Sequence, residues 1–122
     1  MFEGPDPDAA ERRIDDWQAG FEQRAAQARE LAARLTRLTA SARSDNGLVT
    51  VTVGGNGMLT GLELDEDVRR QPAAETARQI LATLTAAQAG LVAQATAVTA
   101  ETVGADSETG KAVLASLARR QP

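Results

Sequence analysis

One stretch near the middle of the chain decides the fold, residues 47–65: GLVTVTVGGNGMLTGLELD. Apolar and polar residues alternate from Val49 to Val53, and β-branched side chains dominate, which indicates a strand with one buried face. The glycines that follow, with Asn56-Gly57, permit the positive φ angles of a tight turn. A second alternating run completes a β-hairpin. We expect its strand to place four side chains on one face: Met58, Thr60, Leu62 and Leu64.

A long stretch with helical periodicity precedes the hairpin. It begins near Asp8, a candidate N-cap with Glu11 three residues later, and continues to about residue 40. Its residues follow a coiled-coil-like heptad, with Ile14, Phe21, Ala28 and Leu35 at one position and Trp17, Arg24, Leu31 and Leu38 at the other, where Arg24 is the one polar residue. At about 1.5 Å per residue such a helix is on the order of 50 Å long. We expect it to project as an arm or to pair with another chain.

The segments next to the hairpin complete the expected order. The turn signal Asp45-Asn46-Gly47 favours a short edge strand over residues 39–44, although these residues also suit the end of the helix. A charged connector, residues 65–71, leads to a second long helix from about Pro72 to Val103, and Gly104 is a suitable stop. The tail contains one more candidate helix, with apolar residues on one face: Val113, Leu114 and Leu117.

These elements predict an α+β fold of order α-β-β-β-α, with a small antiparallel sheet between two long helices. We place a flexible N-terminus at residues 1–7, the domain at 8–104 and a C-terminal tail at 105–122. So small a sheet is marginal alone, and a chain with 2% aromatic residues buries only a thin core, so we expect a homodimer. The expected dimer interface consists of the apolar hairpin residues: Val49, Val51, Val53, Met58, Leu62 and Leu64.

Composition argues against catalysis. The chain has no His, Cys or Tyr, which are the usual acid-base and nucleophilic residues, and Lys111 is its single lysine. The densest acidic group, residues 65–67, offers too few placed ligands for a cation. We therefore expect no enzyme activity, cofactor, metal or small-molecule substrate. We identify no apolar run of membrane-spanning length and no signal peptide, so we expect a cytoplasmic protein without a membrane partner.

The helix, strand and hairpin pattern resembles the YbaB/EbfC family of small bacterial nucleoid-associated proteins over roughly residues 10–100. The most specific part is the GLVTVTVGGNG segment at 47–57 with the closing LELD at 62–65. The resemblance implies a homodimer with tweezer-like arms that binds double-stranded DNA in the nucleoid with little sequence preference. The chain departs from the family at 85–89, where an Asn-x-Ala motif is missing, and at 91–103, which holds Glu101 and no basic residue.

Charge is distributed unevenly along the chain. The net charge is −4 and the isoelectric point is about 4.8, which disfavours tight binding to phosphate. Residues 1–23 carry seven acids against two arginines, whereas residues 24–45 carry five arginines against two acids, a local +3. We expect DNA contacts from these five: Arg24, Arg29, Arg34, Arg37 and Arg43. The alternative is a solvated helix face with local pairs such as Glu30 with Arg34.

Trp17 and Phe21 are the aromatic residues of the first helix, and two interpretations of them stay open. Their heptad spacing favours a place in the dimer seam or under the fold. If they lie beyond the globular body, they form an exposed patch for a partner. The second interpretation supports an alternative function, a protein-interaction adaptor that keeps the fold without binding DNA.

Overall fold

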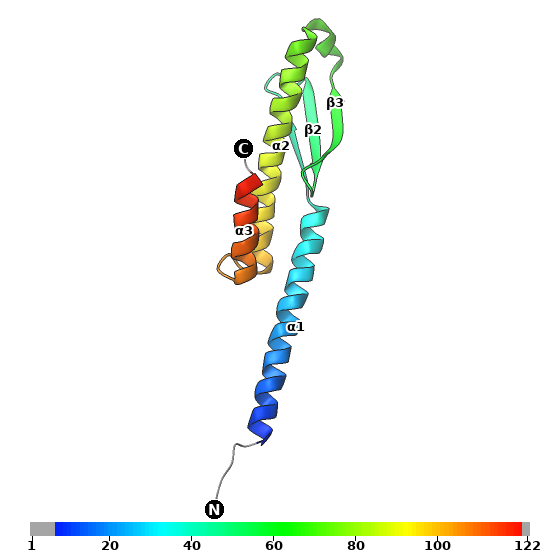
Figure 1. Cartoon of the computed structure of the whole chain (residues 1–122). Helices are drawn as coiled ribbons and strands as arrows, with labels where there is room; N and C mark the ends of the chain where they lie inside the picture. The colour runs from blue at the N-terminus through cyan, green and yellow to red at the C-terminus, as the bar shows by residue number, and fades with distance from the viewer. Residues whose placement is uncertain (1–6, 121–122) are drawn as a thin grey trace, which may run out of the picture.

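A computed structural model of the chain describes residues 7–120, in which the predicted order α-β-β-β-α is confirmed and a further helix follows (Figure 1). The elements are α1 (Pro7–Arg37), β1 (Thr39–Arg43), β2 (Val49–Gly54), β3 (Leu59–Leu64), the 3-10 helix η1 (Glu66–Arg70), α2 (Ala73–Thr102) and α3 (Glu108–Arg120). The sheet and α2 lie together, and α1 extends away from them as a long arm.

Two boundaries of α1 differ from the expectation. The helix begins at Pro7, so Asp8 lies in its first turn and is not the N-cap. It ends at Arg37, earlier than expected, because Thr39 already pairs with Gly54 in the sheet. This settles residues 39–43 as a strand. The flexible segment expected over residues 1–7 lies, apart from Pro7, outside the described residues.

The sheet has the order β1-β2-β3 and both pairs are antiparallel. A bulge shifts the register after Thr52, so that Gly61 pairs with Thr52 but Leu59 pairs with Val53. The predicted face of the second strand is therefore wrong in part. Met58 precedes the strand and Thr60 is the extra residue of the bulge. The residues that share a face with the β2 valines are Leu59, Leu62 and Leu64.

The core lies between the sheet and α2. Val49, Val51 and Val53 of β2 are fully buried and pack with Ala40 of β1 and with α2. The buried residues of α2 recur every four positions: Thr83, Ala87, Leu91, Ala95 and Thr99. Because α2 packs against β1 and β2, the apolar side chains of β3 stay exposed.

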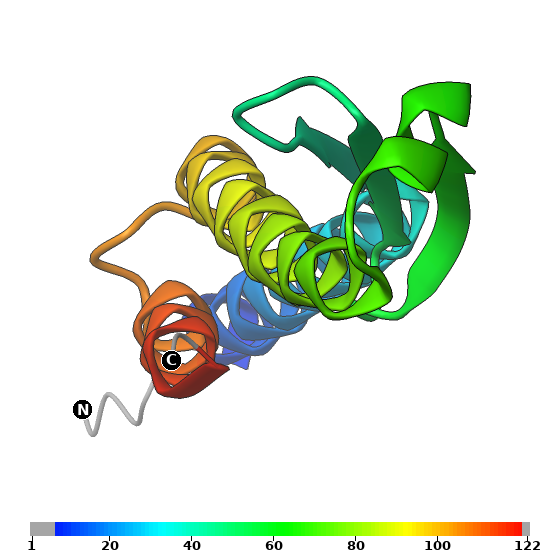
Figure 2. The ribbon, with the colours of Figure 1, turned by 90° about the horizontal axis from the view of Figure 1, so that it is seen from above.

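Helix α3 confirms the tail helix expected from the sequence. It packs along the C-terminal half of α2, which lies between α3 and the sheet (Figure 2). Gly104 ends the preceding helix with φ +83°. Gly110 is buried, and a side chain there would collide with the carbonyl oxygen of Gly104. Leu117, which lies seven residues later and therefore on the same face of α3, is also buried.

Helix α2 is long and apolar enough to cross a membrane by length and composition alone. This corrects the expectation that the chain contains no such stretch. Core helices of soluble proteins share this composition, and α2 packs against the sheet and α3. The composition by itself therefore assigns no membrane role.

Candidate nucleic-acid interface

The predicted arginines of α1 form a band round the helix. At about 100° per residue, Arg29, Arg37, Arg34 and Arg24 follow one another at intervals of about 60–80°. They span about 20 Å along the helix axis. Arg43 lies nearby in sequence on β1, on the sheet face that carries Ser41 and Thr50. The structure thus gathers these side chains near one part of the arm but not on a single face.

Arg34 connects α1 to α2. Its Nη1 donates to Thr102 Oγ1 at 2.7 Å and its Nη2 donates to Glu101 Oε2 at 3.1 Å. The pair of Glu30 with Arg34 that the sequence suggested is therefore wrong. Because Glu101 already compensates this charge, Arg34 mainly fixes the position of the arm.

The other three arginines of the band and Arg43 keep most of their donors exposed. Arg37 Nε donates to the carbonyl oxygen of Ala33, and Arg43 Nη2 donates to that of Gly47, each at 3.2 Å. Within residues 7–120, Arg24 and Arg29 take part in no ion pair. These four guanidinium groups are thus accessible to an anionic ligand.

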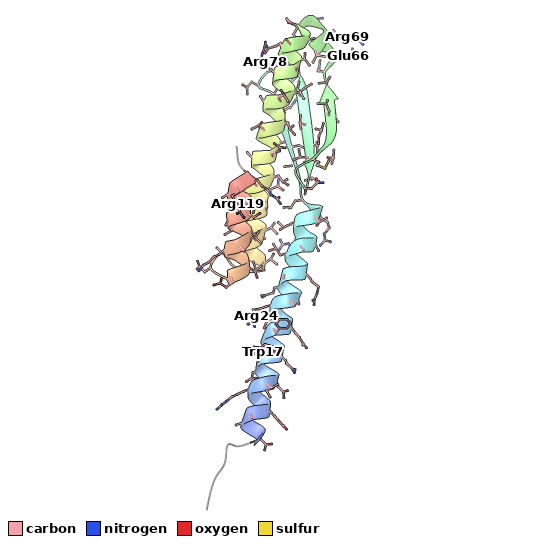
Figure 3. All side chains as sticks on the ribbon, in the orientation of Figure 1. Trp17, Arg24, Glu66, Arg69, Arg78 and Arg119 are labelled. Carbon is pink, nitrogen blue, oxygen red and sulfur yellow. The ribbon has the colours of Figure 1, made fainter. Side chains whose placement is uncertain are left out.

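Helix α3 brings further basic residues to the same region, and the sequence interpretation left them out. Arg120 lines a surface hollow of about 550 Å³ together with Ala32, Leu35 and Thr36 of α1. Arg119 lies in the same last turn of α3 (Figure 3). Their position at the end of an amphipathic segment could have identified them from the sequence as the last turn of a helix, because cations are favoured at helix C-termini.

The basic residues at the opposite end of the molecule are compensated by neighbouring acids (Figure 3). Three pairs form there: Arg69 with Glu66, Arg70 with Asp67 and Arg78 with Glu75. The hydrogen bond and the charge of Arg78 hold the pKa of Glu75 below its ordinary value.

The acidic group at residues 65–67 caps the 3-10 helix, since Asp65 Oδ1 accepts from the backbone N–H of Asp67 at 2.9 Å. Among residues 7–120, no group of three or more acidic side chains is placed to hold a metal ion. Local capping and pairing therefore account for these acids.

A known protein family matches most of the chain. The model of the YbaB/EbfC DNA-binding family matches residues 11–106. The chain belongs to this family. Searches of curated proteins and of solved structures found no match. The YbaB/EbfC match ends before α3 begins, so Arg119 and Arg120 lie outside the matched region.

The residues expected at a YbaB/EbfC dimer interface fall into two groups. Val49, Val51 and Val53 are fully buried within the single chain, so they cannot form a surface for a second copy. The alternation showed a buried face, but α2 of the same chain covers it. The exposed group, which we call the β3 surface, consists of Met58, Leu59, Leu62 and Leu64.

Trp17 lies on the outer half of α1, beyond the end of α3 (Figure 3), and Phe21 follows it about one helical turn later. Their rings stack with centroids 5.8 Å apart and planes inclined by 16°. Their exposed fractions are 64% and 56%, so neither residue packs under the fold of the single chain.

Proposed function

We propose that the protein is a non-enzymatic, nucleoid-associated DNA-binding protein of the cytoplasm. It binds the backbone of double-stranded DNA as a homodimer with little sequence specificity. The observation that carries the proposal is the band of accessible arginines on α1, joined by the arginines of α3, in a member of a DNA-binding family.

The chemistry of the band suits phosphate rather than bases. Each guanidinium that contacts a phosphate releases condensed counterions, which supplies sequence-independent affinity. Residues 24–45 contain no aromatic side chain on which an unpaired base can stack. The chain carries no recognition-helix motif, so we expect no sequence-specific contact in the major groove.

Charge also limits how much of the arm contacts DNA. Residues 8–23 carry five acids against two arginines, a local net charge of −3. Phosphate is repelled by this outer half and attracted by the inner half, where the charge is +3 over residues 24–45. The duplex therefore lies against the inner half of α1, next to α3.

Dimerisation supplies the second half of the DNA surface. The β3 surface is apolar and belongs to an edge strand that no element of residues 7–120 covers. A two-fold axis beside it buries the same leucines from both copies. The dimer doubles the number of arginines that one duplex meets.

Two matched triple variants test the DNA surface. The band variant carries Arg24→Gln, Arg29→Gln and Arg37→Gln. The control carries Arg69→Gln, Arg70→Gln and Arg78→Gln, with the same change in net charge at the paired end of the molecule. We expect the band variant to bind a random duplex more weakly, with a salt slope reduced by about 0.9 for each phosphate that is no longer neutralised. Equal weakening in both variants would contradict the proposed surface.

The adaptor is the second candidate function, favoured by the exposed Trp17 and Phe21. It predicts no duplex binding at low salt and a specific protein partner that Trp17→Ala abolishes. Partners that disappear on nuclease treatment would argue against it.

A further inference from the structure

The outer half of α1 carries an apolar stripe that nothing in residues 7–120 covers. Ile14, Trp17 and Phe21 recur with the spacing of neighbours on one helix face, and each is more than half exposed. We call these three residues the arm stripe. A contiguous exposed group of this kind, with two stacked aromatic rings, is typical of an interaction surface.

The arm stripe continues a seam that already packs in the inner half of the helix. Further along the helix the same heptad positions hold Ala28, Leu31 and Leu35. Leu31 is buried in this inner half, which packs against α2. The outer half extends past α3, where this face has no partner (Figure 1). The arm stripe thus repeats, on the uncovered outer half of α1, the apolar pattern with which the inner half packs against α2.

The charges beside the arm stripe point to the kind of partner. At about 100° per residue, Glu11 and Glu22 lie along one side of the stripe and Arg13 lies along the other; Arg24 is on this second side too, at the heptad position of Trp17. The side chain of Arg24 folds back along Gly20 on that second side, with Nη1 3.6 Å from the position of a Cβ there. A complementary partner therefore needs a basic side and an acidic side about an apolar stripe.

A second copy of this helix meets that need in one orientation. In a parallel pair related by a two-fold axis, the acidic side of one helix faces the basic side of the other, whereas an antiparallel pair places like sides together. We infer that the arm stripe binds the arm stripe of a second copy in a parallel coiled coil. This contact is separate from the β3 surface, which lies at the other end of the molecule.

The area involved predicts a weak contact. Four aromatic rings that are now about half exposed, with two Ile14 side chains, bury on the order of 500 Å². Stable interfaces bury about 1,200–2,000 Å². The arms therefore pair at high local concentration. If the proposed β3 dimer forms, the arm contact links dimers into larger assemblies, because each chain then has two different self-association surfaces.

Trp17 is the single tryptophan, so its fluorescence reports the contact directly. We expect the emission maximum to shift to shorter wavelength as protein concentration rises, together with a larger species in sedimentation. The variant with Ile14→Gln and Phe21→Gln keeps the reporter and should show neither change. The control Leu81→Gln removes another exposed apolar side chain and should show both.

The same measurement distinguishes the arm contact from dimerisation through the β3 surface and from binding to DNA. A Leu62→Gln, Leu64→Gln variant should keep the fluorescence shift while no longer forming the β3 dimer. The shift should persist without DNA at about 0.5 M salt, since screening also relieves the repulsion between two acidic arms. Emission that stays at the exposed wavelength at every concentration, or that shifts equally in the double glutamine arm variant, would overturn the arm contact.

Orientation is tested with one introduced thiol, because the chain has no cysteine. Ala10 lies in line with the arm stripe, and Ala26 lies on the opposite side of the helix. In a parallel pair two copies of Ala10→Cys adjoin and should oxidise to a disulfide-linked dimer, whereas Ala26→Cys should not. In an antiparallel pair centred on Trp17 the thiols of Ala10→Cys lie about 20 Å apart, and the absence of cross-linking would contradict the parallel orientation.

Discussion

Gly55 controls how closely the arm packs against the body. It lies in the turn between β2 and β3, where the last turn of α1 crosses. A Cβ at this position would lie 2.7 Å from the carbonyl oxygen of Thr36 and closer still to that of Leu35. Both obstacles are backbone atoms, which no rotamer change can move. In Gly55→Ala, α1 must therefore withdraw by about 1 Å to restore ordinary contact.

The cost of this substitution has two parts. Overpacking of this kind costs about 1–3 kcal/mol. The withdrawal also stretches the 2.7 Å hydrogen bond from Arg34 to Thr102, which contributes about 1 kcal/mol. We expect Gly55→Ala to lower the free energy of unfolding by about 2–4 kcal/mol in total. With an m-value of about 2 kcal/mol/M, the urea midpoint falls by about 1–2 M.

Urea unfolding followed by circular dichroism measures the effect. The matched control is Gly90→Ala, in which the new Cβ has only Ala40 Cβ nearby, at 3.9 Å, and which should stabilise α2 by up to about 1 kcal/mol. A double-mutant cycle with Arg34→Ala should be non-additive, because withdrawal already weakens that contact. A midpoint for Gly55→Ala equal to that of the wild type would refute the reasoning.

Three further predictions address other parts of the molecule. Gly110→Ala should release α3 from α2, seen as reduced amide protection over 108–120 by hydrogen exchange; unchanged protection would show that the loop accommodates a side chain. The carboxyl of Glu75 should titrate in NMR below the ordinary range, so its small contribution to stability is present above the unfolded pKa and is lost as pH falls through the folded one. Arg78→Ala should return that pKa to its ordinary value, and a pKa that stays low would assign the shift to another cause. Leu62→Gln with Leu64→Gln should convert the proposed β3 dimer to monomers in sedimentation without unfolding them, and an unchanged dimer would place the interface elsewhere.

Local patterns in the sequence predicted most of the elements. The alternation from Val49 to Val53 identified β2 and its buried face, and Gly104 marked the end of α2. The alternation did not say which surface covers the valines, because burial by α2 and burial by a second copy require the same pattern. The bulge after Thr52 was missed for a similar reason, since Leu59 and Thr60 each fit an alternating strand until the register is known.

The candidate site was harder to predict from the sequence, because its contacts join residues that lie far apart along the chain. Arg34 bonds to Glu101 across 67 positions, whereas helical spacing suggested only its near neighbour Glu30. The place of Arg120 beside Thr36 depends on how α3 folds back over α2. The heptad identified the face of α1 that carries Trp17, but it could not show that the body ends before that residue.

The most direct test of DNA binding is a fluorescence-anisotropy titration of the wild-type protein with a random-sequence duplex at about 50 mM and about 200 mM salt. We predict binding at the lower salt that weakens steeply at the higher salt, with a slope that reflects the number of arginines bound to phosphate. The absence of binding at the lower salt, from a sample shown to be folded and dimeric, would contradict the proposal and favour the adaptor.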